Sequence, residues 1–353
     1  MAIRVLVVDD SAFMRKLLSE ILNEQPDIEV VAAARNGEDA LKKLEQIAVD
    51  VVTLDVEMPV MGGLETLDRI MQNRPVPVIM LSSVTKKGSE TTMKALSRGA
   101  FDFIPKPSGA ISLDIRAVAS ELVGKVRAAS GAGTAAVRRP SLQPERRPVR
   151  PVLRTATGGS HNIVVAIGSS TGGPRALEQV ISRIPGDLPA SVVMVQHMPK
   201  GFTKSFAERL NAVGELSVKE AESGDRLCRG HAFLAPGDYH MVVARDHRII
   251  LNQDPPVQYL RPAADVMMQS LPLVYGSRVV GVILTGMGRD GAAGMALIKA
   301  AGGSTIAQDE ATSVIYSMPR VVAEEGNADY VLPLERIGEA VYRMVGAMLH
   351  RSK

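Results

Sequence analysis

The feature that most constrains the fold is a repeated alternation, through the first 125 residues, of short apolar runs with stretches whose apolar residues recur at helical spacing. Ile3–Val8 predicts a buried strand, and the helical pattern that follows starts after Ser11, a residue type that commonly caps helices. The cycle then repeats, with strands expected at Val30–Ala34, Val51–Leu54, Val78–Leu81 and Phe101–Ile104, and helical stretches around Ala40–Ile47, Leu64–Met71 and Thr91–Leu96. Five such cycles predict an α/β fold, a doubly wound (βα)5 parallel sheet of the flavodoxin-like kind, with ligands at the carboxyl ends of its strands.

A second pattern of the same kind begins after Ser160. Strands are expected at Asn162–Ile167, Ser191–Val195, Val279–Leu284 and Ser304–Ala307, and the helix after the first of them carries Leu177, Val180, Ile181 and Ile184. A hairpin is expected from Ala232–Leu234 and Met241–Val243, followed by Arg248–Leu251. The second half is therefore predicted to be another α/β domain with a Rossmann-like parallel sheet.

The segment between the two patterns has a different composition, rich in Gly, Ala, Pro, Thr and Arg from about Ala128 to Ser160. Prolines interrupt a helix and like charges repel, so this stretch predicts an extended linker. The proline and arginine positions are Pro140, Pro144, Pro148, Pro151, Arg138, Arg139, Arg146, Arg147, Arg150 and Arg154. We expect a first domain at 1–125, a linker at 126–160 and a second domain at 161–350. The alternative for the linker is an arm that binds an acidic surface or nucleic acid.

Composition limits the partners and the compartment. The length of 353 residues suits two domains, and the formal net charge of +3 is too small to indicate a nucleic-acid partner. Cys228 is the only cysteine and no signal peptide is recognisable, so we expect a reducing, cytoplasmic location. No run approaches the roughly 18 apolar residues of a membrane span, so no direct membrane insertion is expected.

Five polar side chains follow the predicted strands of the first domain. Asp9 and Asp10 close the first strand and Asp55 the third. Carboxylates gathered at one edge repel unless a hard cation such as Mg²⁺ joins them, which predicts a divalent ion beside Asp55. Ser82 and Lys106 end the fourth and fifth strands and add the hydroxyl and the cation needed to hold a phosphoryl group.

This constellation, with Asp55–Pro59 and Gly62–Gly63 in the adjoining loop, closely resembles the receiver domain of bacterial response regulators. The resemblance implies that Asp55 accepts a phosphoryl group from a histidine kinase. It also implies Mg²⁺ ligands from Asp10, Asp55 and the Glu57 carbonyl, with Asp9 positioning the ion. Ser82 and Lys106 would respond to the new charge and shift the outer face between two states.

The main chemical signal of the second half is the strand-to-helix turn Ala166–Pro174, in which Gly168, Ser170 and Gly172 match G-x-S-x-G. Such a turn holds a nucleophilic serine, and amides at the following helix start, with Thr171 the candidate, can stabilise an oxyanion. A phosphate-binding loop is the competing interpretation. The dinucleotide fingerprint fails, because Ser170 stands where its second glycine is needed.

A nucleophilic serine needs a base and an orienting carboxylate. His197, in the QHMP segment that ends the next strand, is the best-placed histidine. The other histidines are expected to be surface or packing residues: His161, His231, His240, His247 and His350. Asp290, in the glycine-rich loop after Val279–Leu284, is the expected carboxylate, and Asp309 is the runner-up; a helix cap is the alternative for either.

Together, the serine loop, QHMP and LTGMGRDGA resemble the catalytic domain of chemotaxis protein-glutamate methylesterases, and Gly201–Thr203 and Arg261–Asp265 also fit. The resemblance implies a hydrolase without a cofactor of its own, in which Ser170 is nucleophile, His197 base and acid, Asp290 orienter, and the Met287 amide part of the oxyanion hole. Arg261 is a candidate substrate contact, or the anchor of a helix start. The implied substrates are glutamyl methyl esters, and also glutamines, of methyl-accepting chemotaxis receptors.

In that family the unphosphorylated receiver covers the catalytic mouth, so the resemblance also implies control through Asp55. The chain order Ser, His, Asp differs from that of α/β-hydrolases, where the carboxylate precedes the histidine. Other outputs considered are a DNA-binding regulator, a non-catalytic signalling module and a nucleotide-dependent oxidoreductase. Basic residues clustered in the linker argue against the first, and the missing glycine at Ser170 argues against the last.

Overall fold

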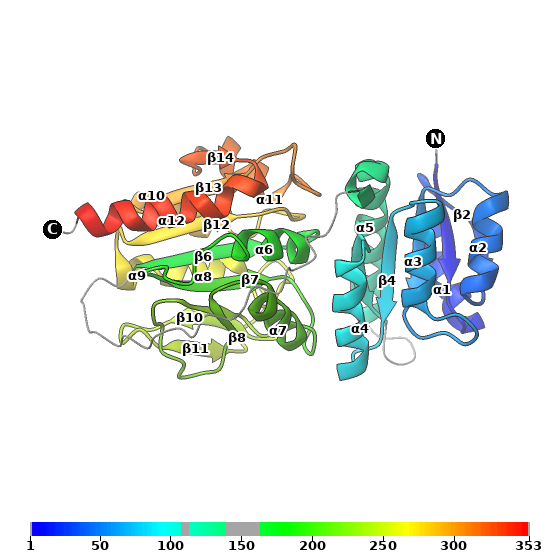
Figure 1. Cartoon of the computed structure of the whole chain (residues 1–353), viewed down its shortest axis with the longest axis horizontal. Helices are drawn as coiled ribbons and strands as arrows, with labels where there is room; N and C mark the ends of the chain where they lie inside the picture. The colour runs from blue at the N-terminus through cyan, green and yellow to red at the C-terminus, as the bar shows by residue number, and fades with distance from the viewer. Residues whose placement is uncertain (1, 107–112, 139–162, 352–353) are drawn as a thin grey trace. The chain divides into compact units, whose positions relative to one another are not determined.

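The computed structural model describes residues 2–106, 113–138 and 163–351, with side chains described for most of them. The chain divides into two compact units, Met1–Gln143 and Pro144–Lys353 (Figure 1). Each unit is an α/β structure built on its own parallel sheet, as the two sequence patterns predict. In the described part of the chain, no helix combines the length and the apolarity that crossing a membrane requires.

The first unit has a five-stranded sheet in the order β2-β1-β3-β4-β5. Every pairing in it is parallel; β3 and β4 are buried throughout, whereas the interior of the edge strand β2 is partly exposed. Helix α1 packs beside α5, whereas α2, α3 and α4 pack against one another in series, as expected for a doubly wound sheet. The elements are β1 (Ile3–Val8), α1 (Ala12–Asn23), β2 (Ile28–Ala34), α2 (Gly37–Gln46), β3 (Val51–Asp55), α3 (Gly63–Asn73), β4 (Val78–Ser82), α4 (Lys86–Ser97), β5 (Asp102–Pro105) and α5 (Leu113–Arg138).

Local caps explain where several of these helices begin. The side chains of Ser11, Asn36 and Thr85 accept hydrogen bonds from backbone amides in the first turns of α1, α2 and α4. The cap predicted at Ser11 is therefore confirmed. Because β1, β3, β4 and β5 run parallel, their carboxyl ends all lie at one edge of the sheet.

Helix α5 corrects the expected start of the linker. It continues to Arg138, so residues 126–138 are helical and not extended chain. Alanine-rich sequence supports a helix even where its periodicity fades, and the prolines that would block one begin only at Pro140. The rest of the predicted linker, 139–160, lies outside the described residues, as does His161.

The second unit has a seven-stranded, entirely parallel sheet in the order β14-β13-β12-β6-β7-β9-β8. The chain leaves β6 toward β7 on one side and later returns to β12 on the other. Strand order reverses at this point, and ligands of doubly wound sheets bind there. The strands of the sheet are β6 (Val164–Ser169), β7 (Ser191–Gln196), β8 (Ser217–Glu220), β9 (His231–Leu234), β12 (Val279–Ile283), β13 (Ser304–Gln308) and β14 (Tyr330–Leu332). A separate two-stranded sheet is formed by β10 (His240–Val243) and β11 (Ile249–Asn252).

The expected hairpin is only partly right. Met241–Val243 does pair antiparallel with the next strand, as β10 with β11, but Ala232–Leu234 lies in the main sheet as β9, parallel to β7 and β8. Strands β8 and β14 were not predicted, since β8 (SVKE) has one apolar residue and β14 (YVL) is only three residues long. An edge strand has less need of an apolar pattern than a central one.

Helices of the second unit cover the sheet and enclose an apolar core between the sheet and helices α8 and α10. Helices α8 and α10 also pack closely against each other. The helices are α6 (Gly173–Ile181), α7 (Thr203–Val213), α8 (Ala264–Ser270), α9 (Pro272–Tyr275), α10 (Ala292–Ala300), α11 (Met318–Glu324) and α12 (Leu334–Arg351).

Candidate functional site

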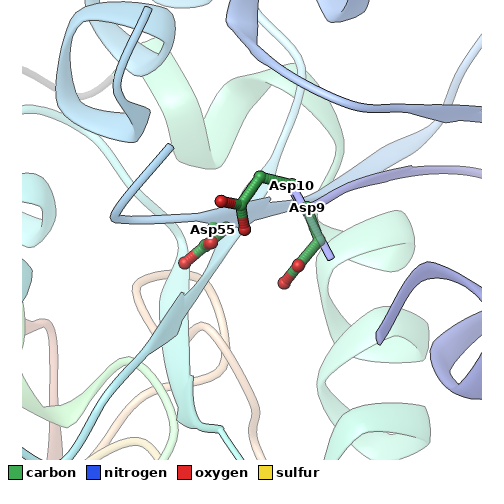
Figure 2. A group of neighbouring side chains, drawn as sticks. All are labelled: Asp9, Asp10 and Asp55. Atoms are coloured by element: carbon green, nitrogen blue, oxygen red, sulfur yellow. The ribbon is translucent and has the colours of Figure 1, made fainter. Parts of the chain in front are cut away.

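Three carboxylates meet at the carboxyl edge of the first sheet. Asp9 and Asp10 come from the end of β1 and Asp55 from the end of β3, so all three sit on neighbouring strands (Figure 2). One oxygen of each lies within 4.8 Å of the others. Asp9 and Asp55 are buried and Asp10 is exposed, which leaves the cluster open on one side. Oxygen-rich clusters of this size suit a hard divalent cation.

Lys106 reaches the same cluster from the end of β5. Its Nζ lies 2.9 Å from Asp9 Oδ2 and 2.7 Å from Asp55 Oδ2. Both oxygens are buried, and Lys106 is the cation that the described residues place against them. Three carboxylates thus face one ammonium, so the excess of negative charge and of oxygen ligands fits a bound divalent cation.

The remaining predicted receiver residues adjoin the cluster. The Glu57 amide donates to Asp55 Oδ1 over 3.2 Å, which keeps Glu57 beside that carboxylate. Ser82 is buried at the end of β4, and its carbonyl accepts from the Lys106 amide at 2.8 Å. The structure therefore brings Asp9, Asp10, Asp55, Ser82 and Lys106 to one edge, as their positions after the strands predict.

The acidity of Asp55 reflects its burial. Burial raises the pKa of Asp55 to about 6, against the opposing pull of the Lys106 ammonium, and the neighbouring Asp9 adds to the rise. Burial alone would lower the pKa of Lys106, but its bonds to Asp55 and Asp9 raise it above its usual value. The cluster thus holds one cation, the Lys106 ammonium, and a carboxylate, Asp55, that binds a proton more readily than an ordinary aspartate does.

In the second unit, the three predicted hydrolase motifs follow β6, β7 and β12, which are adjacent in the sheet. Ser170 comes directly after β6, His197 after β7 and Asp290 in the loop after β12. The Ser170 amide donates to the Thr285 carbonyl over 3.1 Å, and the His197 amide donates to the Ser169 carbonyl over 3.1 Å. The three motifs therefore share the edge at which the strand order reverses.

His197 and Asp290 form a close pair. His197 Nε2 lies 2.7 Å from Asp290 Oδ2, and the Asp290 side chain is fully buried. The same carboxylate accepts from the Ala264 amide (2.5 Å) and the Asp265 amide (2.9 Å) at the start of α8. Burial by itself would raise the pKa of Asp290, but the hydrogen bond from His197 and these amides outweigh it, and the pKa falls below its usual value.

The other ring nitrogen of His197 is the one left for proton transfer. Nδ1 is buried and, among the described residues, has no hydrogen-bond partner. Ser170 Oγ is not bonded to it in this conformation. Since Nε2 is committed to the carboxylate, a neutral ring with its proton on Nε2 presents Nδ1 as the basic atom.

Gln196, a residue not singled out from the sequence, joins the serine and histidine loops. Its Nε2 donates to the Ser170 carbonyl (2.9 Å) and to the His197 carbonyl (3.1 Å), while its Oε1 accepts from Ser169 Oγ (2.7 Å). The side chain is almost fully buried. Its position next to His197 in the QHMP segment could have drawn attention to it. A glutamine at the end of a strand has no acid, base or nucleophile, however, so its residue type alone does not predict a role.

Two amides are available at this edge. Thr171 and Met287 donate to no other group in residues 2–106, 113–138 and 163–351. Thr171 precedes Gly172, whose left-handed φ of 76° turns the chain into α6, and Met287 is an exposed residue in the loop after β12. Free amides next to a serine loop are the groups an oxyanion hole requires.

Arg261 and Asp309 have structural partners. Arg261 Nε and Nη2 both reach Asp238 Oδ1 (3.1 and 2.6 Å), and Nη1 donates to the carbonyls of Gln253 and Asp254. These bonds tie the chain ahead of α8 to Asp238 and to the carbonyls of residues 253 and 254. Asp309 accepts from the amide and hydroxyl of Thr312, as a cap does, whereas Asp290 holds the His197 ring.

Among the other described histidines, His231, His240 and His247 have contacts with residues other than Ser170 and Asp290. His240 is buried and its Nδ1 accepts from the Ala263 amide at 3.3 Å. His231 stacks on Phe233, and His247 lies against Tyr275. His350 is on α12.

Comparison with known proteins follows the same division. A family model described as a response regulator receiver domain matches residues 5–117, and one described as CheB methylesterase matches residues 165–341. The protein-glutamate methylesterase/protein-glutamine glutaminase of Symbiobacterium thermophilum is 53% identical over 352 residues, which cover 98% of this chain and 97% of that protein. The protein of the same name from Pyrococcus abyssi is 50% identical over 349 residues, covering 97% of this chain and 94% of that protein.

A solved structure agrees with the second unit. The crystal structure of the Thermotoga maritima CheB methylesterase catalytic domain is 45% identical, with a TM-score of 0.51, and the match covers 52% of this chain and 98% of that one. These matches do not favour the alternative outputs considered from the sequence. With identity near 50% over nearly its whole length, the chain belongs to the CheB methylesterase family, as a member with a response regulator receiver domain ahead of the methylesterase domain.

Proposed function

We propose that this chain is a phosphorylation-controlled protein-glutamate methylesterase that also deamidates glutamines, acting on methyl-accepting chemotaxis receptors in the cytoplasm. The observation that carries the proposal is the His197–Asp290 pair, whose free Nδ1 lies on the edge where Ser170 also lies. The names of the relatives support both activities.

In the first half-reaction Ser170 Oγ attacks the γ-carbonyl carbon of a glutamyl methyl ester while His197 Nδ1 takes the hydroxyl proton. The carbonyl oxygen becomes an oxyanion, for which the amides of Thr171 and Met287 are the donors. The C–OCH₃ bond then breaks, and the proton held on Nδ1 passes to the leaving oxygen to give methanol. Throughout, Asp290 stabilises the imidazolium and fixes its orientation.

In the second half-reaction His197 Nδ1 takes a proton from water, whose oxygen attacks the acyl carbon. The Ser170 ester bond breaks, the proton returns to Ser170 Oγ, and the free glutamate leaves. With a glutamine side chain the same sequence of steps releases ammonia in place of methanol.

We propose that Asp55 accepts a phosphoryl group from a histidine kinase. Asp10, Asp55 and the Glu57 carbonyl would hold Mg²⁺, with Asp9 positioning it, and the cation would supply charge neutralisation for the incoming phosphoryl group. Lys106, already within ion-pair distance of Asp55, would then pair with the phosphoryl oxygens, and Ser82 would hydrogen-bond to them. The expected limits 161–350 of the second domain belong to this proposal, whereas helix α5 moves the end of the first domain from residue 125 to at least Arg138.

The test is methanol release from a methylated receptor fragment by the full chain, with and without a small phosphodonor and Mg²⁺. Ser170→Ala should abolish release, and Asp55→Asn should keep the basal rate but lose the stimulation. Turnover by Ser170→Ala would refute the nucleophile, and stimulation of Asp55→Asn would refute control through that carboxylate. Asp68→Asn, an exposed receiver acid paired with Arg98, is the matched control and should behave as wild type.

A further inference from the structure

At the N-terminal ends of helices α8 and α10, a carboxylate beside each helix accepts hydrogen bonds from backbone amides of the other helix. Asp290, just ahead of α10, accepts from the amides of Ala264 and Asp265 in the first turn of α8. In return Asp265, on α8, accepts from the Gly294 amide in the first turn of α10 over 2.8 Å. Each acid thus satisfies amides that the other helix leaves without an intrahelical partner.

These reciprocal hydrogen bonds fix where α10 begins. Asp290 is followed by Gly291, whose left-handed φ of 93° turns the chain directly into α10, so a shift of the α10 N-terminus carries Asp290 with it. The helices are in close contact here, since a Cβ on Gly294 would overlap Met268 of α8. Asp265 is therefore the polar side chain that locks the α10 start against α8.

Keeping Asp265 in this place is costly. Its side chain is buried, and burial raises the pKa of Asp265, with the nearby charge of Asp290 adding to the rise. An apolar side chain of similar size would pack at this position without that cost. The hydrogen bond that Asp265 accepts from the Gly294 amide is thus the one contribution that an apolar side chain could not make here.

We propose that Asp265 is a positioning residue for ester hydrolysis. By holding the first turn of α10, it places the Asp290 carboxylate within hydrogen-bond distance of His197 Nε2. The inference rests on the proposed Ser170–His197–Asp290 mechanism and adds to it a fourth residue that touches neither the substrate nor the histidine. Other groups facing the α8 start are His240, bonded to the Ala263 amide, and His197 itself.

The experiment compares Asp265→Ala with wild type in the full chain. Because displacement of an orienting group by about 1 Å can cost roughly 100-fold in rate, kcat for a methylated receptor fragment should fall by about 10- to 100-fold. KM should change little, since Asp265 does not touch substrate. The proton on His197 Nε2, seen by ¹H NMR as a downfield ring resonance, should shift or broaden.

The control is Asp329→Ala. Asp329 also accepts from a backbone amide, that of Thr305, but it lies at the amino ends of β13 and β14, opposite the site. This control should leave kcat and the ring resonance unchanged. Asp265→Asn, which keeps an acceptor oxygen for Gly294, should recover most of the activity.

A folded Asp265→Ala variant with wild-type kcat, or one whose kcat falls while the ring resonance stays in place, would overturn the proposal. If that variant does not fold, Asp265→Leu decides, because it fills the same space without an acceptor for the Gly294 amide: an unchanged ring resonance would equally overturn the proposal. The resonance needs no turnover, so it tests Asp265 even if Ser170→Ala shows the esterase mechanism itself to be wrong.

Discussion

Two buried carboxylates of this chain, Asp55 and Asp290, have pKa values displaced in opposite directions. Around Asp55, burial prevails over the single cation of Lys106 and raises the pKa to about 6. Around Asp290, the His197 hydrogen bond and two amides prevail over burial and lower the pKa. Asp55 therefore takes up a proton below about pH 6, at a higher pH than an ordinary aspartate does, whereas Asp290 stays ionised to pair with an imidazolium.

The raised pKa of Asp55 predicts how magnesium binding depends on pH. Mg²⁺ binds the ionised carboxylate, so below about pH 6 it must displace a proton, and its Kd should weaken by up to about tenfold per pH unit. Above about pH 7 the Kd should be nearly constant. Isothermal titration calorimetry of the full chain between roughly pH 5 and 8 measures this.

Asp55→Asn provides the control for that titration, because it removes the titrating group while keeping the side-chain size. The Asp55→Asn variant should bind Mg²⁺ more weakly than wild type, and its Kd should depend much less on pH. A Kd that does not change between pH 7 and 5 in the wild type would contradict the assignment of Asp55 as the proton-linked ligand.

The lowered pKa of Asp290 and its bond to Nε2 predict the effect of Asp290→Asn. The new amide donates to Nε2 and so favours the tautomer with its proton on Nδ1, the atom proposed to act as base. We expect kcat to fall by roughly 10³- to 10⁴-fold, with KM little changed, in a methanol-release assay. The control is Asp309→Asn, because Asp309 also follows a strand but bonds to Thr312 and not to His197; this variant should retain activity. Equal losses of kcat in both variants would argue against the triad.

At the residue scale, the sequence predicted which side chains gather but not how they bond. Ser170, His197 and Asp290 are each marked by residue type and by position after a strand. Side-chain geometry decides that His197 bonds to Asp290 through Nε2, and it also decides the bridges made by Gln196 and Asp265. Neither residue type nor spacing in the sequence encodes this geometry. Asp265 lay within the Arg261–Asp265 run that fitted the family, yet nothing in the run assigned it a role.

At the element scale, buried parallel strands were predictable because they are continuous apolar runs between helical patterns. β6, β7 and β12 carry that signal, and the loops after them hold Ser170, His197 and Asp290, the residues proposed to be catalytic. The expected pairing of residues 232–234 with 241–243 failed because neighbours in sequence were taken as neighbours in the sheet, whereas β9 reaches across to β7. Pairing partners of short strands follow from tertiary packing, which local pattern does not contain.

The junction of β6 with α6 predicts a strong effect of Gly173→Ala. A Cβ there would overlap Gln196 Oε1, the atom that accepts from Ser169, so the bridge between the serine and histidine loops must move. We expect a loss of about 1–3 kcal/mol in the free energy of unfolding and a fall in kcat. Denaturant unfolding and the methanol assay measure the two effects.

Gly346→Ala is the matched substitution for this test. Gly346 lies in α12, and a Cβ there would meet nothing within 4 Å, so alanine should leave activity intact and raise stability by up to about 1 kcal/mol through helix propensity. If Gly173→Ala were as harmless as Gly346→Ala, the tight contact with Gln196 would have no part in holding the site.

At the scale of the whole molecule, the chain is two units, each with its own sheet and core. The change of composition after about residue 128 predicted the division, but helix α5 runs on to Arg138, because a helix can end well after its apolar periodicity fades. The five receiver residues lie wholly within the first unit and the hydrolase residues wholly within the second. Chemistry and control are thus carried by parts that fold around separate cores.

This separation predicts that residues 163–353 alone form an active esterase. All of Ser170, Gln196, His197, Asp265 and Asp290 are in this piece, and the related Thermotoga maritima catalytic domain was crystallised as such. The piece should unfold cooperatively and release methanol from a methylated receptor fragment at a rate that a phosphodonor and Mg²⁺ do not alter, because it lacks Asp55.

The full chain, assayed beside that piece, tells whether the first unit inhibits or only accompanies the second. If the unphosphorylated receiver restrains the site, the full chain should be slower than the piece until phosphodonor is added, and Asp55→Asn should remain slow throughout. Equal basal rates for the full chain and the piece would mean that phosphorylation activates by a route other than relief of inhibition. An inactive but folded piece would instead place part of the catalytic requirement in the receiver, against the complete set of site residues found in the second unit.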